Sequence, residues 1–206
     1  MTIIFDFDGT IADSFEFVTA FLERYAAGGR KLTVTELATM RGMTMPQMAR
    51  RMGSSRWRLP LLFVLGRHAM GRTIYDVPIF VGMGRVIEQL HAEGHELMIV
   101  SSNNSRNIRK FLKQHHLYKY FTDLYGGAGF FGKRRAISAV LARNNIHPRD
   151  AVYIGDETRD VEAARAAGIR VISVVWGFAQ RDTLEAMEPE AVAYETQDIV
   201  RILEEL

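Results

Sequence analysis

The stretch that decides the fold is Thr2-Ile3-Ile4-Phe5-Asp6-Phe7-Asp8-Gly9-Thr10. Its first part is apolar and rich in β-branched and aromatic residues, which predicts a buried strand over Thr2 to Phe7. Asp6 lies near the end of that strand, and Asp8 and a turn sequence follow it directly. The chain must leave the extended conformation near Gly9, where a loop can present backbone N–H groups to an anion.

Further along the chain, strand and helix patterns alternate from about residue 78. Short apolar runs predict strands, and apolar residues three or four positions apart predict the helices between them. The expected strands cover 95–101, 120–125, 151–154, 170–175 and 191–194, and the expected helices cover 83–93, 104–115, 133–145, 158–167 and 197–205. This alternation predicts an α/β fold with a Rossmann-like parallel sheet and helices on both of its faces.

Residues 15–75 interrupt the alternation immediately after the first strand. Apolar residues recur there at helical spacing, and Gly28-Gly29 ends the first of several short helices. We therefore expect a small α-helical cap over 15–75, inserted into an α/β core formed by 1–14 and 76–206.

The composition narrows the class of protein. Of 206 residues, 48% are hydrophobic and none is cysteine, which excludes global disorder, disulfides, thiolate metal sites and cysteine catalysis. The N-terminus lacks the pattern of a signal peptide. The longest apolar run, Leu59 to Leu65, is far shorter than the roughly 20 residues of a transmembrane helix. We expect a cytoplasmic protein without a transmembrane segment.

Charge is distributed unevenly. No acid occurs from Leu37 to Tyr75, a stretch with seven arginines: Arg41, Arg50, Arg51, Arg56, Arg58, Arg67 and Arg72. Subtracting them from the 26 basic residues leaves 19, against 24 acidic residues. The basic segment has three interpretations, in decreasing order of weight: a solvated face, recognition of an anionic substrate, and peripheral membrane contact through Trp57 and the 59–65 run. No nucleic-acid-binding motif accompanies the charge, and the sequence does not indicate an oligomeric state.

Polar side chains follow several of the predicted strands. Because ligands of open α/β sheets bind beyond the carboxyl ends of the strands, these groups are expected to meet at one edge. Carboxylates without cysteine favour a hard cation, and Mg²⁺ is the natural choice. A carboxylate can also be the nucleophile in phosphoryl transfer. The groups are Asp6 and Asp8, Ser101, Lys133, and Asp156 and Asp160.

Each of these patterns has a simpler interpretation when taken alone. Asp8-Gly9-Thr10 is typical of a turn, and Asp156 is placed to cap the helix expected from Thr158. The segment Gly127 to Gly132 fits G-x-G-x-x-G, with Asp156 at about the spacing of a ribose-binding acid. A dinucleotide site would leave the Asp6 motif without a role, so a loop that delivers Lys133 is the better interpretation.

Four segments, in order and spacing, resemble the four motifs of the haloacid dehalogenase superfamily. The resemblance spans roughly residues 1–177, with the phosphoglycolate-phosphatase-like hydrolases as the closest subgroup. One departure is Arg134-Arg135 after Lys133, where these relatives usually have a proline. The segments are Phe5-Asp6-Phe7-Asp8-Gly9-Thr10, Leu97-Met98-Ile99-Val100-Ser101-Ser102-Asn103, Gly132-Lys133 and Tyr153-Ile154-Gly155-Asp156-Glu157-Thr158-Arg159-Asp160.

The resemblance implies a role for each matched position. Asp6 would attack phosphorus, and Asp8 would protonate the leaving oxygen and then activate water. Mg²⁺ would bind the Asp6 carboxylate, the Asp8 backbone carbonyl and the Asp156 carboxylate, with Asp160 in support. The residues expected to bind the phosphorylated substrate are Gly9, Thr10, Ser101, Ser102 and Lys133.

The function that follows is a Mg²⁺-dependent phosphatase acting on a small phosphorylated metabolite, phosphoglycolate or a related monoester, through an aspartyl-phosphate. The presence of Asp8 favours phosphate chemistry over the carbon–halogen cleavage of the dehalogenases, which lack an acid there. Two alternatives stay open: a phosphomutase of the β-phosphoglucomutase type, and a non-catalytic binding module with the same fold.

Overall fold

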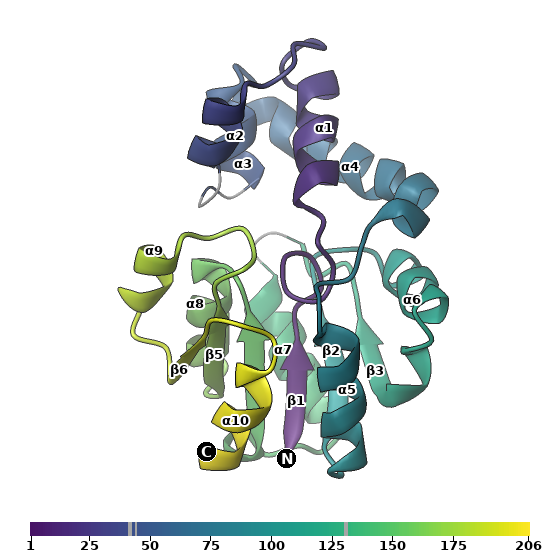
Figure 1. Ribbon diagram of the computed structural model, residues 1–206, viewed down its shortest axis with the longest axis vertical. Helices are drawn as coiled ribbons and strands as arrows, with labels where there is room; N and C mark the ends of the chain where they lie inside the picture. The colour runs from purple at the N-terminus through teal and green to yellow at the C-terminus, as the bar shows by residue number, and fades with distance from the viewer. Residues whose placement is uncertain (41–42, 44, 130–131) are drawn as a thin grey trace.

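A computed structural model of the protein describes residues 1–40, 43, 45–129 and 132–206. A parallel sheet with helices on both faces forms the larger part, and a group of helices lies beyond the carboxyl ends of its strands (Figure 1). These helices lie between the first two strands in sequence. The expected α/β fold with an inserted helical cap is confirmed, while the domain boundaries at 14/15 and 75/76 stay a prediction.

The sheet has six strands in the order β3-β2-β1-β4-β5-β6, and neighbouring strands are parallel throughout. The first strand in sequence is thus central. The strands are β1 (Thr2–Phe5), β2 (Glu96–Val100), β3 (Phe121–Tyr125), β4 (Ala151–Gly155), β5 (Arg170–Val174) and β6 (Ala191–Ala193). Strand β1 ends two residues earlier than expected, because the chain bends at Phe7 and turns from Gly9 onward.

Alternate side chains of β1 enter two separate cores. Ile3 and Phe5 pack under one set of helices, and Ile4 packs under the other. Full burial of each such side chain contributes about 1.5–3 kcal/mol. The first face carries α5 (Met83–Ala92), α6 (Ser105–Gln114) and α10 (Asp198–Glu205), and the second carries α7 (Lys133–Arg143) and α8 (Thr158–Ala166).

The cap has its own apolar centre. Met40, Met48 and Met52 are buried there, as expected for methionines that fill a small core. Phe178, from the loop after β5, reaches into the same group. The cap helices are α1 (Phe15–Tyr25), α2 (Val34–Met40), α3 (Met45–Arg51) and α4 (Leu59–Thr73), with 3₁₀ turns η1 (Arg56–Arg58) and η2 (Ile74–Asp76).

Short elements complete the core: 3₁₀ turns η3 (Tyr118–Tyr120) and η4 (Pro148–Asp150), and helix α9 (Arg181–Glu185), which the sequence patterns did not predict. Within the part of the chain that the structure describes, every helix is too short or too polar to span a bilayer. Trp57 and Leu61 are 88% and 58% exposed on the cap. Membrane contact through them stays a prediction.

Candidate active site

The loops after β1, β2 and β4 meet at the centre of the sheet. Phe5 is in register with Ile99 on one side and Ile154 on the other. The residues that follow these positions therefore lie side by side, and the Asp6 N–H donates to the Ile154 carbonyl at 2.8 Å. The register thus brings three polar loops from distant parts of the sequence into one place.

Asp6 is held by two donors. Its Oδ1 accepts from the Phe7 N–H at 2.7 Å, and its Oδ2 accepts from Lys133 Nζ at 2.6 Å. Lys133 is the first residue of α7 and is 2% exposed, like Asp6. Burial lowers the pKa of Lys133, but the carboxylates of Asp160 and Asp6 outweigh burial and the net shift is upward. Lys133 is therefore a fixed positive charge beside the Asp6 carboxylate.

Asp160 organises the start of α8. Its Oδ2 accepts from the N–H groups of Asp156 and Glu157, and its Oδ1 accepts from Lys133. Glu157, rather than Asp156, is the N-cap of α8, in a reciprocal capping box with Asp160. Burial raises the pKa of Asp160 to about 6, although Lys133 opposes this shift.

Asp156 is fully buried and is held on both oxygens. Oδ1 accepts from the Thr10 hydroxyl at 2.9 Å, and Oδ2 accepts from the Phe178 N–H at 2.8 Å. Burial and the nearby acids Glu157 and Asp160 raise its pKa well above the usual range. Gly9, at φ +79°, passes so close that a Cβ would collide with the Asp156 carboxylate. The loop after β1 is thus packed onto the loop after β4.

Asp8 faces the space between core and cap. Its Oδ2 accepts from Asn103 Nδ2 at 2.9 Å, while its buried Oδ1 finds no hydrogen-bond partner among the described residues. Burial and the neighbouring Asp6 raise the pKa of Asp8 to about 6, and the hydrogen bond from Asn103 limits the rise. A carboxyl with this pKa exchanges protons near neutral pH, as a general acid and base must.

The donor set fits a divalent cation. Oxygens of Asp6, Glu157 and Asp160 all lie within 4.8 Å of one another and are buried. Asp8 and Asp156 add two further carboxyls, and burial together with mutual repulsion raises both of their pKa values. Because five acids surround Lys133 and Arg159, the group has an excess of negative charge that a hard cation with oxygen ligands would balance.

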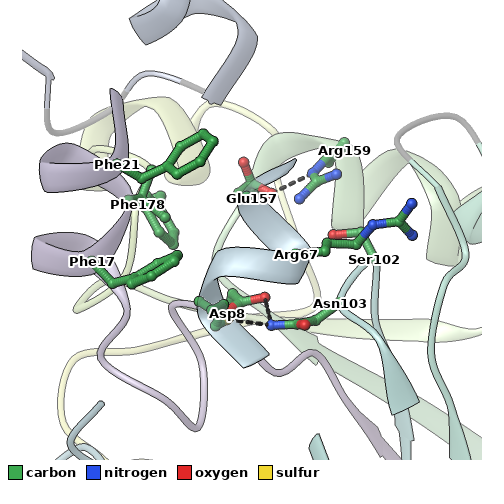
Figure 2. A pocket seen from close by; sticks show the side chains of 12 residues that line it. Asp8, Phe17, Phe21, Arg67, Ser102, Asn103, Glu157, Arg159 and Phe178 are labelled. Carbon is green, nitrogen blue, oxygen red and sulfur yellow. Dashed lines mark hydrogen bonds and ion pairs between the residues drawn. The ribbon is translucent and has the colours of Figure 1, made fainter. Parts of the chain in front are cut away.

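A pocket opens above Asp8, between the core and the cap. Phe17 and Phe21 of α1 lie on one side with Phe178, and the guanidinium groups of Arg67 and Arg159 lie on the other (Figure 2). Arg159 pairs with Glu157. Ser102, Asn103 and Met70 also line the pocket. Its walls therefore combine apolar surface with two cations and with the acids Asp8 and Glu157, as in pockets that orient a small polar ligand.

The structure brings most of the predicted site residues together, but at different depths. Asp6, Ser101 and Lys133 are between 0 and 2% exposed. Ser101 Oγ accepts from the Asn103 N–H at 3.1 Å, which shapes the loop after β2. Thr10 is fully buried with its hydroxyl on Asp156, so this side chain supports the loop and does not line the pocket. A substrate phosphate can reach Asp6 only after surrounding groups move.

Four residues of the site were not predicted: Asn103, Glu157, Arg159 and Arg67. Glu157 had a sequence signal, since it is the remaining acid between Asp156 and Asp160 at the end of a strand. Arg67 had none that separates it from the other cap arginines, because only the packing of α4 selects it. Arg41, Phe130 and Phe131, which belong to the basic segment and the glycine loop, lie outside the described residues.

Comparisons with known proteins agree with this arrangement. A family model described as haloacid dehalogenase-like hydrolase matches residues 3–174. A phosphoglycolate phosphatase of Synechococcus elongatus is 34% identical over 206 residues, covering 99% of this chain and 97% of that protein. One of Aquifex aeolicus is 23% identical over 207 residues, covering 98% and 96%. The crystal structure of a predicted phosphatase from Clostridium acetobutylicum shares the fold, with TM-score 0.84, 21% identity and coverage of 100% and 98%.

Proposed function

Because this chain belongs to the haloacid dehalogenase-like hydrolase family and is a phosphatase of that family, we propose that it hydrolyses a small phosphate monoester through an aspartyl-phosphate on Asp6. The observation that carries the proposal is the pairing of a buried Asp6–Lys133 contact with a protonatable Asp8 two residues along the same loop. A carboxylate, a positive charge and a protonatable acid in one small space support this proposal.

In the first step an Asp6 oxygen forms a bond to phosphorus as the bond to the leaving oxygen breaks. Asp8, protonated, gives its proton to that leaving oxygen. In the second step water attacks phosphorus, its proton passes to Asp8, and the phosphorus–Asp6 bond breaks to release phosphate. Lys133 offsets the negative charge that gathers near Asp6 in both steps.

The metal in this proposal is Mg²⁺, bound through Asp6, Asp156 and Glu157 together with the Asp8 backbone carbonyl. When bound, it would neutralise charge on the phosphoryl oxygens. Asp160 supports the site in this proposal, because it accepts from Lys133 and from the N–H groups of Asp156 and Glu157 and so holds these three residues together. Calorimetric titration with Mg²⁺ tests this assignment without an activity assay: Glu157→Gln is expected to weaken binding, and equal affinity in both proteins would remove Glu157 from the ligand set.

The substrate that we propose is phosphoglycolate or a similarly small monoester with a second anionic group. The support is the pocket, which Arg67 and Arg159 line on the side opposite the three phenyl rings. The full-length similarity to a phosphoglycolate phosphatase of Synechococcus elongatus points in the same direction. The cytoplasm stays the predicted location.

The experiment that tests the mechanism uses Asp8→Asn with an aryl phosphate. An aryl leaving group departs without a proton, so Asp6 is still phosphorylated, but water is no longer activated. The intact protein should therefore gain the mass of one phosphoryl group, and Asp6→Asn should not. In the wild-type protein, transfer of that phosphoryl group to a sugar hydroxyl rather than to water would convert the proposal into a phosphomutase. Absence of the phosphorylated species would contradict it.

A further inference from the structure

A row of hydrogen bonds joins core helix α6 to cap helix α4. Side chains at positions i, i+3 and i+7 of α6 donate to carbonyls at i, i+4 and i+8 of the cap segment. Both spacings place their members along one helix face. Asn107 Nδ2 donates to the Arg67 carbonyl at 2.9 Å, Lys110 Nζ to the Gly71 carbonyl at 3.2 Å, and Gln114 Nε2 to the Tyr75 carbonyl at 2.8 Å.

The two helices touch closely at Gly71. A Cβ placed on this residue would lie 2.9 Å from Asn107 Oδ1. Asn107 itself is 3% exposed, so its amide has little room to move. The carbonyl of Gly71 is one of the last four of α4, which lack intrahelical partners, and Lys110 supplies the missing donor. In this contact, a side chain of α6 therefore satisfies a backbone carbonyl that α4 leaves without a partner.

The row continues from Asn107 into the candidate active site through Asn103. Asn107 Nδ2 also donates to Asn103 Oδ1 at 3.1 Å. Asn103 Nδ2 in turn donates to Asp8 Oδ2 at 2.9 Å, and it contacts Met70 Sδ of α4 at 2.8 Å. A continuous path thus runs from the backbone of the cap helix to the carboxyl of Asp8.

This path fixes the orientation of both amides. The Arg67 carbonyl only accepts, so the amino group of Asn107 must face it. The second hydrogen of that amino group meets the oxygen of Asn103, which also accepts from the Asn104 N–H at 2.7 Å, so the amino group of Asn103 faces Asp8. If α4 moves away, Asn107 loses the Arg67 carbonyl and Asn103 loses its contact with Met70, so the amide that holds Asp8 is less firmly placed and keeps only its core contacts.

We propose that Asn103 and Asn107 couple the docking of the cap to the placement of Asp8, with Asn103 as a positioning residue for the general acid. Access to Asp6 requires movement of surrounding groups, because this side chain is 2% exposed. Separation of α4 from α6 would open access to Asp6, and it would at the same time loosen the contacts that hold Asp8. The inference rests on the proposed role of Asp8 as general acid.

The test compares two substrates. The ratio kcat/KM covers only the steps up to formation of the phosphoenzyme, and an alkyl leaving group needs the proton from Asp8 whereas 4-nitrophenolate does not. Asn103→Ala should lower kcat/KM about 100-fold for phosphoglycolate and less than about 3-fold for 4-nitrophenyl phosphate. Asn107→Ala should lower kcat/KM for phosphoglycolate about 10-fold and should likewise affect 4-nitrophenyl phosphate much less. Arg106→Gln, on the exposed face of α6, is the matched control and should change neither.

Equal losses on both substrates would overturn the inference, because a merely structural role does not distinguish leaving groups. Should Asn103→Ala fail to fold, Gly71→Ala provides a second route. This change favours the helix and keeps both asparagines, yet it presses on the Asn107 amide, so it should reproduce the selective loss.

A failure of the proposed function is recognisable separately, since the wild-type protein would then cleave neither substrate. Docking is measured in that case by hydrogen exchange over 59–73. Asn107→Ala should accelerate exchange of these amides relative to Arg106→Gln, and unchanged rates would remove the docking role as well.

Discussion

The core and the cap present charge in opposite ways. In the core, acids and cations are buried and engaged with one another, as Lys133 is with Asp6 and Asp160. In the cap, a segment without any acid exposes several arginines, among them Arg72, and of the cap arginines that the structure describes Arg67 lines the pocket. The difference separates two tasks. In the function that we propose, the core holds the groups that do chemistry, and the cap supplies a few contacts that choose the substrate.

The comparison predicts the largest effect for a change in the core. Asp6→Asn should lower kcat/KM by about 10⁴-fold or more, because removal of a nucleophile leaves only binding and charge stabilisation. Release of inorganic phosphate from 4-nitrophenyl phosphate measures this. Circular dichroism should show an intact fold in the variant. Residual activity within ten-fold of wild type would show that another group attacks phosphorus.

A second effect concerns the stability of the core without metal. The pKa values of Asp8 and Asp160 lie at about 6, against 3.8 in the unfolded chain, so the native state retains protons that the unfolded chain releases. Stability present below pH 4 should therefore be lost as the pH rises through about 6, by roughly 3 kcal/mol for each of the two groups.

Urea unfolding in EDTA at pH 4.5 and pH 7 measures this loss. Added Mg²⁺ should reduce it, because the cation favours the ionised carboxylates. Asp8→Asn has no proton to lose at this position and should show a smaller decline. Equal stability at the two pH values in EDTA would contradict the raised pKa values.

A smaller effect is expected for the cap arginine that lines the pocket. Arg67→Met should raise KM for phosphoglycolate about 10-fold with little change in kcat, because a contact made equally in ground and transition states affects binding alone. The backbone carbonyl that Asn107 engages is retained in this variant. An unchanged KM would show that Arg159 or another residue, and not Arg67, recognises the substrate.

The smallest effect is expected for an exposed cap arginine, and it separates a specific contact from the general charge of the cap. Arg72→Met changes an exposed arginine on the same helix and should leave kcat/KM within about two-fold of wild type, as is usual for surface substitutions. Steady-state kinetics on the same substrate provide the measurement. If Arg67→Met and Arg72→Met behave alike, general charge of the cap matters and a specific contact does not.

The sequence predicted the core in detail for a physical reason. Buried parallel strands need continuous apolar runs, and the groups at their carboxyl ends must share one edge, so Asp6, Ser101 and Asp156 were expected together. The strand order could not be predicted from the sequence, because several orders bury the same apolar runs. Asn103 and Arg67 depend on how one helix face meets another, and this is a property of packing rather than of spacing. Thr10 is the reverse case: its motif led us to expect a substrate-binding residue, whereas its side chain supports the loop.

The central place of β1 also bears on how the chain is made. Ile3 pairs with Leu97 on one side and with Val152 on the other, so the strand is synthesised long before either partner. During that interval an apolar strand has two open edges, a form that associates readily with other chains. Closure of such long-range pairings is slow. Refolding of this protein should be slow, because β1 pairs only with strands that are distant in sequence, and association through its open edges should make the yield sensitive to protein concentration.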